Sequence, residues 1–238
     1  MICAIAIAQT STNNRYYELR IYYCNPGRLD ALLERFQNHT LKLFEKHGME
    51  NVGYWVPTTA DNNILYYILA FPDRAARDAS FKSFVADPVW KEVAAKSEES
   101  GKIIEKIVSV FMNGADVIPA INASAASPER SFELRTYTCL PGKFPDIVNR
   151  FKNHTVKLFE KHGKQNIAYF ASEEPDGAQS KLVYLVAHES ETAAATSWAA
   201  FRADPEWIKV KEDSEKAGKI LEKVESVYLK PTAFSKIK

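Results

Sequence analysis

The hydrophobic and polar positions of the chain fall into alternating strand-like and helix-like stretches. Residues 16–23 alternate polar or charged side chains with apolar ones, which predicts a strand, and Asn25-Pro26-Gly27 follows as a turn. From Leu29 onward, apolar side chains recur at helical spacing, and Gly48 stands where a helix would end. The first part of the chain is therefore predicted to be a strand followed by an amphipathic helix.

Two further strands, a broken helix and a last strand complete the pattern. The apolar stretches 52–56 and 64–71 flank a polar loop, which predicts an antiparallel hairpin. Residues 74–100 predict a helical region interrupted at Asp87-Pro88, where the aspartate can cap one helix and the proline can open the next. With a strand at 106–112, the predicted order is βαββαβ.

This pattern occurs twice in the chain. Glu18-Leu19-Arg20 returns as Glu133-Leu134-Arg135 at a shift of 115 residues, whereas Asp87-Pro88 returns as Asp204-Pro205 at a shift of 117. Two residues have therefore been inserted between the two registers, and the loop 173–177 is the expected place for them. Self-similarity of this kind indicates a duplicated structural unit.

The predicted fold follows from the face of each sheet that the helices leave bare. A βαββαβ unit puts its helices on one face of an antiparallel sheet, and two units can cover their bare faces by pressing the sheets together. We predict an α+β protein in which two tandem ferredoxin-like units form a dimeric-type α/β barrel with a polar interior. The expected divisions are an N-terminal tail (1–14), a first unit (15–113), a linker (114–129), a second unit (130–231) and a C-terminal tail (232–238).

Composition narrows the choice of partners. The 31 basic and 30 acidic residues leave a net charge of +1, which disfavours binding to nucleic acid, and no apolar run is long enough to predict a membrane span. The three cysteines lack the paired spacing of a disulfide framework or a zinc site, so we predict no metal site. The sequence also has no glycine-rich phosphate loop, and we predict no cofactor. Cys24 and Cys139 are interpreted as small apolar residues that end strands.

The first residues leave the cellular location open. Residues 1–8 are apolar and include Ala6-Ile7-Ala8 before Gln9, which resembles the end of a secretory signal, although a basic start is missing. A truncated signal would place the protein in the periplasm or outside the cell, and otherwise it would be cytoplasmic.

The candidate binding residues come first from strand alternation. We assign Leu19 and Ile21 to the helix side of the sheet, so that the polar side chains between them point the other way. The side chains expected in the barrel interior are Glu18, Arg20, Tyr22, Glu133, Arg135 and Tyr137.

These two triplets allow two interpretations. They form either an ionic network that fixes the packing of the sheets, or a polar pocket for a ligand. In a pocket, arginine and tyrosine would hold a carboxylate or an enolate oxygen, and a desolvated glutamate with a raised pKa would act as a base.

Two histidines are further ligand-binding candidates. On a helical wheel that starts at Leu29, His39 falls at the edge of the apolar stripe beside Asn38, where it could reach the mouth of a cavity, and His154 is its repeat partner. Neither has the i, i+4 partner of a helical zinc motif.

Three motifs recur in the same order in both halves. They are the Glu-Leu-Arg-x-Tyr strand, the Pro-Gly turn (Pro26-Gly27 and Pro141-Gly142), and the segment Phe84-x-x-Asp87-Pro88-x-Trp90. Through them the chain resembles the NIPSNAP family, within the wider group of dimeric α/β barrel proteins, over nearly all of residues 16–230. The resemblance implies the barrel fold but no particular activity, because the family has no agreed one. The wider group includes cofactor-independent monooxygenases, haem-degrading enzymes and isomerases that keep a ligand inside the barrel.

Two classes of function are consistent with these observations. In the first, the protein binds a small molecule in a polar and aromatic barrel lumen, as a binding protein or as a cofactor-independent oxygenase or isomerase. In the second, it is a non-enzymatic scaffold or adaptor that acts through protein–protein interaction. Whether it is an enzyme, and whether it assembles into a homo-oligomer, stay open at this point.

Overall fold

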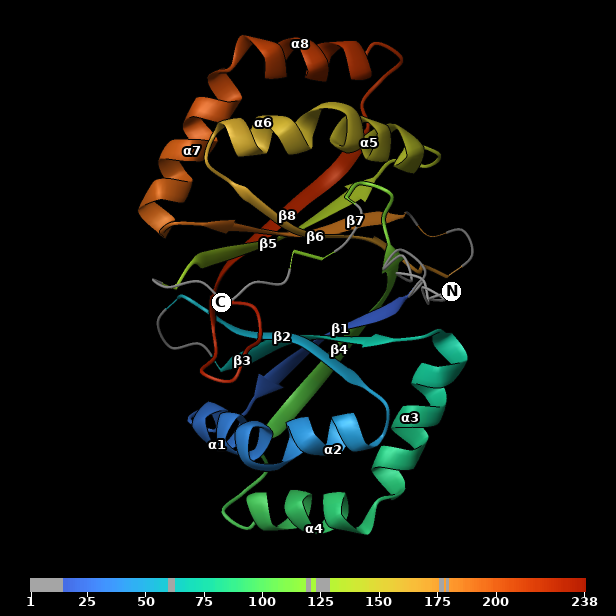
Figure 1. Ribbon diagram of the computed structural model, residues 1–238, viewed down its shortest axis with the longest axis vertical. Helices are drawn as coiled ribbons and strands as arrows, with labels where there is room; N and C mark the ends of the chain where they lie inside the picture. The colour runs from blue at the N-terminus through green and yellow to red at the C-terminus, as the bar shows by residue number, and fades with distance from the viewer. Residues whose placement is uncertain (1–14, 60–62, 119–120, 123–128, 176–177, 179) are drawn as a thin grey trace, which may run out of the picture.

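The computed structural model describes residues 15–59, 63–118, 121–122, 129–175, 178 and 180–238, and it contains the predicted unit twice (Figure 1). The first unit consists of β1 (Tyr16–Cys24), α1 (Leu29–Arg35), η2 (Phe36–Thr40), α2 (Leu41–Lys46), β2 (Glu50–Pro57), β3 (Ile64–Phe71), α3 (Arg74–Ala86), α4 (Pro88–Ser97) and β4 (Ile104–Gly114). The second unit consists of β5 (Ser131–Cys139), α5 (Phe144–Arg150), η3 (Phe151–Thr155), α6 (Val156–Lys161), β6 (Gln165–Ser172), β7 (Lys181–His188), α7 (Glu191–Ala203), α8 (Pro205–Ser214) and β8 (Leu221–Pro231).

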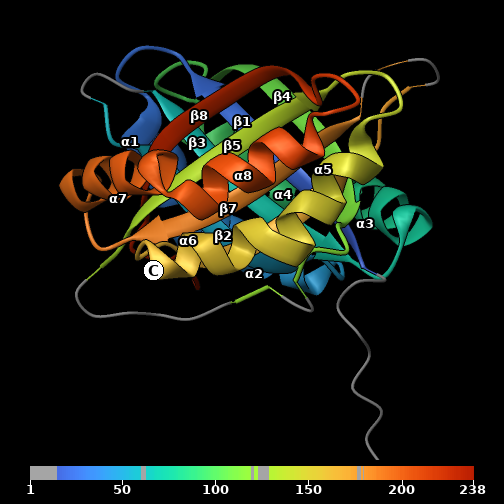
Figure 2. The ribbon, with the colours of Figure 1, turned by 90° about the horizontal axis from the view of Figure 1, so that it is seen from above.

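The eight strands close into one antiparallel barrel in the order β1-β3-β2-β8-β5-β7-β6-β4. Each unit supplies four neighbouring strands, and the two sheets join through the pairs β2–β8 and β4–β6. Figure 1 shows the sheets meeting in the middle with the helices outside them, and Figure 2 shows the helices of the second unit lying across its sheet. The predicted α+β fold, a dimeric-type α/β barrel within one chain, is confirmed.

The strand registers place the two-residue insertion. Trp55 pairs with Tyr66 in the first unit, and the equivalent pair in the second unit is Phe170 with Val183. The first members of these pairs differ by 115 residues and the second members by 117, so the insertion lies in the loop between β6 and β7, as predicted.

The long helix of each unit contains a π-helical turn that the sequence pattern did not predict. These turns, η2 and η3, occupy equivalent positions, and in each the closing threonine donates a hydrogen bond to a carbonyl five residues earlier. Thr40 Oγ1 lies 3.1 Å from the Arg35 oxygen, and Thr155 Oγ1 lies 3.2 Å from the Arg150 oxygen. Because π-helical turns inside α-helices are often found at functional sites, η2 and η3 mark the side chains beside them as candidates for function.

The break between the last two helices of each unit is built as predicted. Asp87 Oδ1 accepts a hydrogen bond from the Val89 amide at 2.9 Å, and Asp204 Oδ1 accepts one from Glu206 at the same distance. The other carboxylate oxygen of Asp204 contacts Lys161 and His162, at the end of the preceding long helix. Each aspartate therefore caps one helix and ties it to another.

We expect Asp204→Ala to lower the melting temperature by about 2–4 °C, since an N-cap, an ion pair with Lys161 and a hydrogen bond with His162 are lost together. Hydrogen bonds from Lys161 and His162 hold the pKa of Asp204 well below its usual value. The contribution is therefore complete at neutral pH and should shrink as the pH falls below about 4. Melting curves at several pH values test this, with Asp213→Ala, which removes only exposed ion pairs, as the control. Equal effects of the two substitutions would contradict it.

The barrel interior is mainly apolar, so the predicted polar interior is wrong. Aliphatic and aromatic side chains from both sheets pack in it, among them Tyr17, Trp55, Phe132 and Phe170, all at most 3% exposed. An open pocket of about 360 Å³ adjoins this cluster, and Lys181 and Glu225 are the charged residues that line it. The packed cluster excludes water and offers no partner to a charged group, which disfavours the glutamates and arginines of β1 and β5 on this face.

Two segments at the edges of the expected units are part of this packing. Ile237, in the expected C-terminal tail, is buried in the barrel interior, and Ser235 accepts a hydrogen bond from the Tyr54 amide at 3.0 Å. In the expected linker, Ala115 and Val117 are buried against the second unit. The expected N-terminal tail lies outside the described residues.

Cys24 and Cys139 end β1 and β5 as predicted, and both are buried. Burial raises the pKa of each thiol to about 11, which keeps both protonated at neutral pH. Among the helices that the structure describes, none is both long and apolar enough to span a bilayer.

Candidate functional site: a pocket between the sheet and the helices of the second unit

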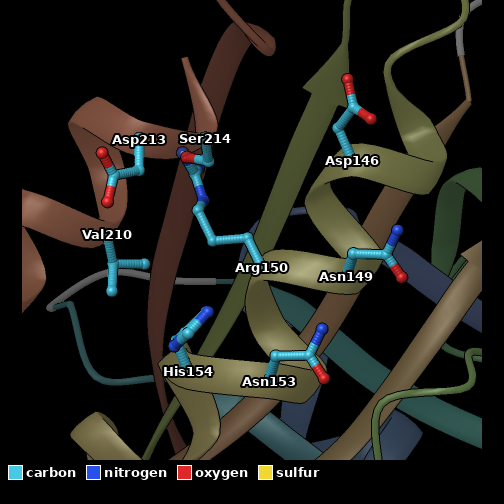
Figure 3. A pocket seen from close by; sticks show the side chains of 8 residues that line it. All are labelled: Asp146, Asn149, Arg150, Asn153, His154, Val210, Asp213 and Ser214. Atoms are coloured by element: carbon cyan, nitrogen blue, oxygen red, sulfur yellow. The ribbon is translucent and has the colours of Figure 1, made fainter. Parts of the chain in front are cut away.

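The two predicted histidines lie on the outer side of the helix layer. Both are exposed, His39 on η2 and His154 on η3, and each lines a shallow groove next to the last helix of its unit. Figure 3 shows the groove of the second unit, which is lined by Asp146, Asn149, Arg150, Asn153, His154, Val210, Asp213 and Ser214. Both grooves are outside the barrel, and a ligand-binding role for His39 and His154 stays a prediction.

Each groove contains one buried arginine that the sequence analysis missed. Arg150 Nη1 lies 3.0 Å from Glu215 Oε1 and 3.2 Å from Ser214 Oγ, and Arg35 Nη1 lies 3.1 Å from Ser97 Oγ. The Nε atom of each arginine is buried and finds no hydrogen-bond partner among the described residues. The signal was available in the sequence, because the Arg-Phe pair at the start of each π-helical turn repeats at the shift of 115.

The two Glu-Arg-Tyr triplets face the helices and not the barrel interior, which reverses the predicted orientation. Leu19 and Leu134 belong to the cluster inside the barrel, whereas Tyr22 and Tyr137 pack with the helices of their units. Alternation along the strand was correct, but the faces were exchanged because the charged residues find their partners on the helix side.

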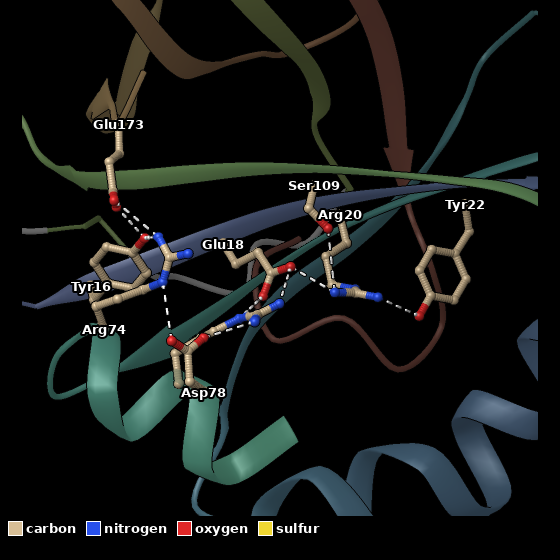
Figure 4. Close-up of polar contacts among 9 residues, drawn as sticks. Tyr16, Glu18, Arg20, Tyr22, Arg74, Asp78, Ser109 and Glu173 are labelled. Atoms are coloured by element: carbon tan, nitrogen blue, oxygen red, sulfur yellow. Dashed lines mark hydrogen bonds and ion pairs between the residues drawn. The ribbon is translucent and has the colours of Figure 1, made fainter. Parts of the chain in front are cut away.

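In the first unit, the triplet forms a closed ionic network (Figure 4). Arg20 bridges Glu18 Oε1 at 2.6 Å and the Tyr22 hydroxyl at 3.2 Å. From α3, Arg77 donates two further hydrogen bonds to the Glu18 carboxylate, at 2.8 and 2.9 Å. Glu18 is therefore neutralised by two arginines, as expected of a network that fixes packing.

In the second unit, the equivalent glutamate, Glu133, has different partners. Glu133 is hydrogen-bonded to Arg135, and its Oε2 accepts hydrogen bonds from Trp198 Nε1 at 2.6 Å and from His188 Nε2 at 3.1 Å. Arg135 also donates to the Tyr137 hydroxyl at 3.3 Å. The second arginine of the first unit has no counterpart, since alanine, Ala194, occupies that position.

Three apolar residues of the first unit are polar or more polar in the second. Met49 corresponds to Lys164, Phe71 to His188, and Phe81 to Trp198. All three replacements are buried and lie around Glu133 or Arg135. Buried polar groups cost stability unless they are paired, so the change marks the second unit as the candidate site.

Glu133 is not the base that the sequence suggested. Burial alone would raise the pKa of Glu133, but the hydrogen bonds from His188 and Trp198 and the charge of Arg135 outweigh it, so the pKa is lowered. Both carboxylate oxygens already accept hydrogen bonds, which with the lowered pKa favours a role in orienting neighbours over one in taking up protons.

A pocket of about 390 Å³ opens beside this cluster, between the sheet and the helices of the second unit. Its walls combine aromatic rings and cationic groups from β5, β8, α5, η3, α6, α7 and α8. The lining residues are Arg135, Tyr137, Arg150, Phe151, Thr155, Phe159, Trp198, Phe201, Arg202, Trp207, Lys211, Glu215, Lys219, Leu221 and Val224. This volume is typical of sites that bind small molecules.

The charges of the lining favour an anion. Five lining residues are basic, and Glu215 is the one acidic residue among them, already paired with Arg150. Two of the basic residues are specific to the second unit, because Arg202 and Lys211 correspond to Val85 and Ala94 in the first. Of the eight predicted residues, this pocket brings together Arg135 and Tyr137.

In the second unit, the groove beside His154 and the pocket share one lining residue, Arg150. Its guanidinium lies 5.4 Å from the centre of the Trp207 ring, within cation–π distance. Among the residues that the structure describes, no cluster of three or more His, Cys, Asp or Glu side chains is arranged to hold a metal ion.

Comparison with known proteins gives the chain a family and a fold. The NIPSNAP family model matches it twice, over residues 17–119 and 132–236. Protein NipSnap homolog 3A from Homo sapiens is 23% identical over 248 residues, covering 100% of this chain and 92% of the relative. The protein of the same name from Pongo abelii is 24% identical, covering 94% and 86%.

Solved structures share the whole barrel. An anthrone oxidase-like protein superposes with a TM-score of 0.60 at 11% identity, covering 96% of both chains. A protein from Lactobacillus acidophilus NCFM, described provisionally as a monooxygenase, superposes with a TM-score of 0.55 at 10% identity, covering 93% of this chain and 98% of its own. At such low identity these likenesses demonstrate a common fold and leave the chemistry of this chain to its own residues.

Proposed function

Because the chain belongs to the NIPSNAP family through both of its units and its second unit holds a cationic aromatic pocket, we propose that the protein binds a small acidic aromatic molecule there. The observation that carries the proposal is the excess of cationic side chains in the pocket, five against one carboxylate. The proposed site moves the predicted binding function from the barrel lumen to the space between sheet and helices.

The pocket has one part for each portion of such a ligand. Trp198, Phe201 and Trp207 provide flat walls for a ring system. Arg135 can donate a charge-assisted hydrogen bond to a carboxylate, since its side chain lines the pocket and is 15% exposed. Tyr137, held by Arg135, adds a hydroxyl on the same side. Binding rather than proton transfer is favoured, because Glu133 is engaged by three donors.

Isothermal titration with 2-naphthoate tests the proposal, with neutral 2-naphthol as the matched ligand. We expect 2-naphthoate to bind and Arg135→Met to weaken its binding roughly tenfold or more, since a hydrogen bond to a charged group is lost. The matched control is Arg20→Met, which makes the same change in the first unit and should alter the Kd less than about twofold.

Three results would overturn the proposal. They are equal affinity for naphthoate and naphthol, equal effects of the two arginine substitutions, and the absence of binding by either ligand. The scaffold or adaptor function would then be the better explanation, and a partner protein recovered with the full chain would support it.

A further inference from the structure

Helix α7 holds a serine against the buried lysine of the second unit. Lys164 Nζ lies 2.7 Å from Ser197 Oγ, and Lys164 as a whole is 1% exposed. Ser197 also donates a hydrogen bond to the His162 carbonyl. In this arrangement Lys164 donates to Ser197. Once the amine is neutral, the serine hydroxyl can turn from the His162 carbonyl toward it, which places the two groups for proton transfer.

The surroundings of Lys164 disfavour its charged form. Its Nζ atom lies among the rings of Trp198, Phe201 and Phe159, with centroids at 4.2, 5.1 and 5.3 Å. The ring faces attract an ammonium group, whereas the exclusion of water from around it favours the neutral amine. Burial lowers the pKa of Lys164 to about 8. Among the charged groups around it, Glu133 on β5 raises that pKa, whereas Arg135 on β5 and Arg202 on α7 lower it. A sizeable fraction of the amine is therefore neutral at mildly alkaline pH and can accept a proton.

Ser197 also borders an open groove. It lines a space of about 580 Å³ between α7, the end of β7 and the turn after α6, together with His162, Gly163, His188 and Thr196. The three aromatic residues around the lysine do not line this groove. The groove is distinct from the ligand pocket, with no lining residue in common.

The first unit provides the same serine without the lysine. Ser80 corresponds to Ser197, but Met49 occupies the position of Lys164 and is also buried. The serine–lysine pair is thus specific to the second unit, and methionine is a residue that this position of the fold accepts.

We propose that Ser197 is a nucleophile activated by Lys164 and that it accepts an acyl group from an activated ester or thioester in the groove. The neutral Lys164 amine takes the hydroxyl proton as Ser197 Oγ bonds to the acyl carbon. The bond from that carbon to the leaving alkoxide or thiolate then breaks, this anion takes a proton from water in the open groove, and the Lys164 ammonium returns the hydroxyl proton to solvent. The products are the acylated serine and the free alcohol or thiol.

Incubation of the full chain with p-nitrophenyl acetate, followed by peptide mass spectrometry, tests this step. We expect one acetyl group on Ser197, removable by hydroxylamine as an ester, with release of one nitrophenolate per chain. Ser197→Ala should abolish the adduct, and Lys164→Met should slow its formation roughly 100-fold or more. Ser80→Ala, the matched change in the first unit, should leave the rate unchanged.

The pH profile separates the pair from a merely structural contact. The rate of acylation should rise with pH through a midpoint near 8 in the wild type, as the Lys164 amine becomes neutral, and this rise should be absent in Lys164→Met. No adduct on Ser197, or an adduct that forms equally fast in Lys164→Met, would overturn the proposal. Binding of 2-naphthoate should survive Ser197→Ala. Failure of the acylation proposal can therefore be distinguished from failure of the ligand-pocket proposal.

Discussion

Glu133→Ala is expected to lower the free energy of unfolding by about 3–5 kcal/mol, because it leaves buried donors without an acceptor. The Glu133 side chain is 1% exposed and accepts hydrogen bonds from Arg135, His188 and Trp198. Its removal takes away the acceptor of His188 Nε2. The other ring nitrogen, Nδ1, already finds no partner among the described residues. Urea denaturation monitored by circular dichroism measures the loss.

A double-mutant cycle with His188→Phe makes this expectation specific. Phenylalanine is the residue that the first unit has at the same position, Phe71, so the substitution fits the fold while it removes one donor. We expect Glu133→Ala to cost less in the His188→Phe background, with a coupling energy of about 0.5–3 kcal/mol. Additive effects of the two substitutions would contradict a shared network, and a loss below about 1 kcal/mol would contradict the burial of an unpaired charge.

The fold was predictable because its signals are local and occur twice. Hydrophobic periodicity located the strands and helices, and Asp87-Pro88 located the break between α3 and α4. The bare face of each predicted sheet then required the barrel. The π-helical turns were not predictable in the same way, since a single extra residue per turn leaves the apolar stripe nearly intact.

The site was predicted only in part, because alternation separates two faces without saying which one meets the helices. Every residue of β1 from Tyr16 to Arg20 is buried, so neither face is marked by exposure. The deciding partners, Arg77 for Glu18 and Trp198 for Glu133, come from helices far along the chain. Comparison of the two units by residue identity would have shown the asymmetry, since Lys164 replaces Met49 at an otherwise apolar position.

The barrel interior contains a pair of residues that has changed together between the units. Gly53 lies against the indole of Trp55 in β2, and at the equivalent places in β6 the second unit has Ala168 and Phe170. A Cβ atom added at Gly53 would lie 2.5 Å from Trp55 Cζ2 and closer still to Cη2. The larger ring therefore requires the smaller backbone neighbour, and the smaller ring leaves room for a methyl group.

Gly53→Ala is accordingly expected to lower the free energy of unfolding by about 1–3 kcal/mol through overpacking. Trp55→Phe alone should also destabilise the barrel, since the indole is 1% exposed and packs against Phe132. The double variant reproduces the arrangement of the second unit and should be more stable than the sum of the two single effects, measured by urea denaturation. Strict additivity would show that the methyl group and the indole do not compete for the same space, and the barrel interior would then be more loosely filled than its buried side chains indicate.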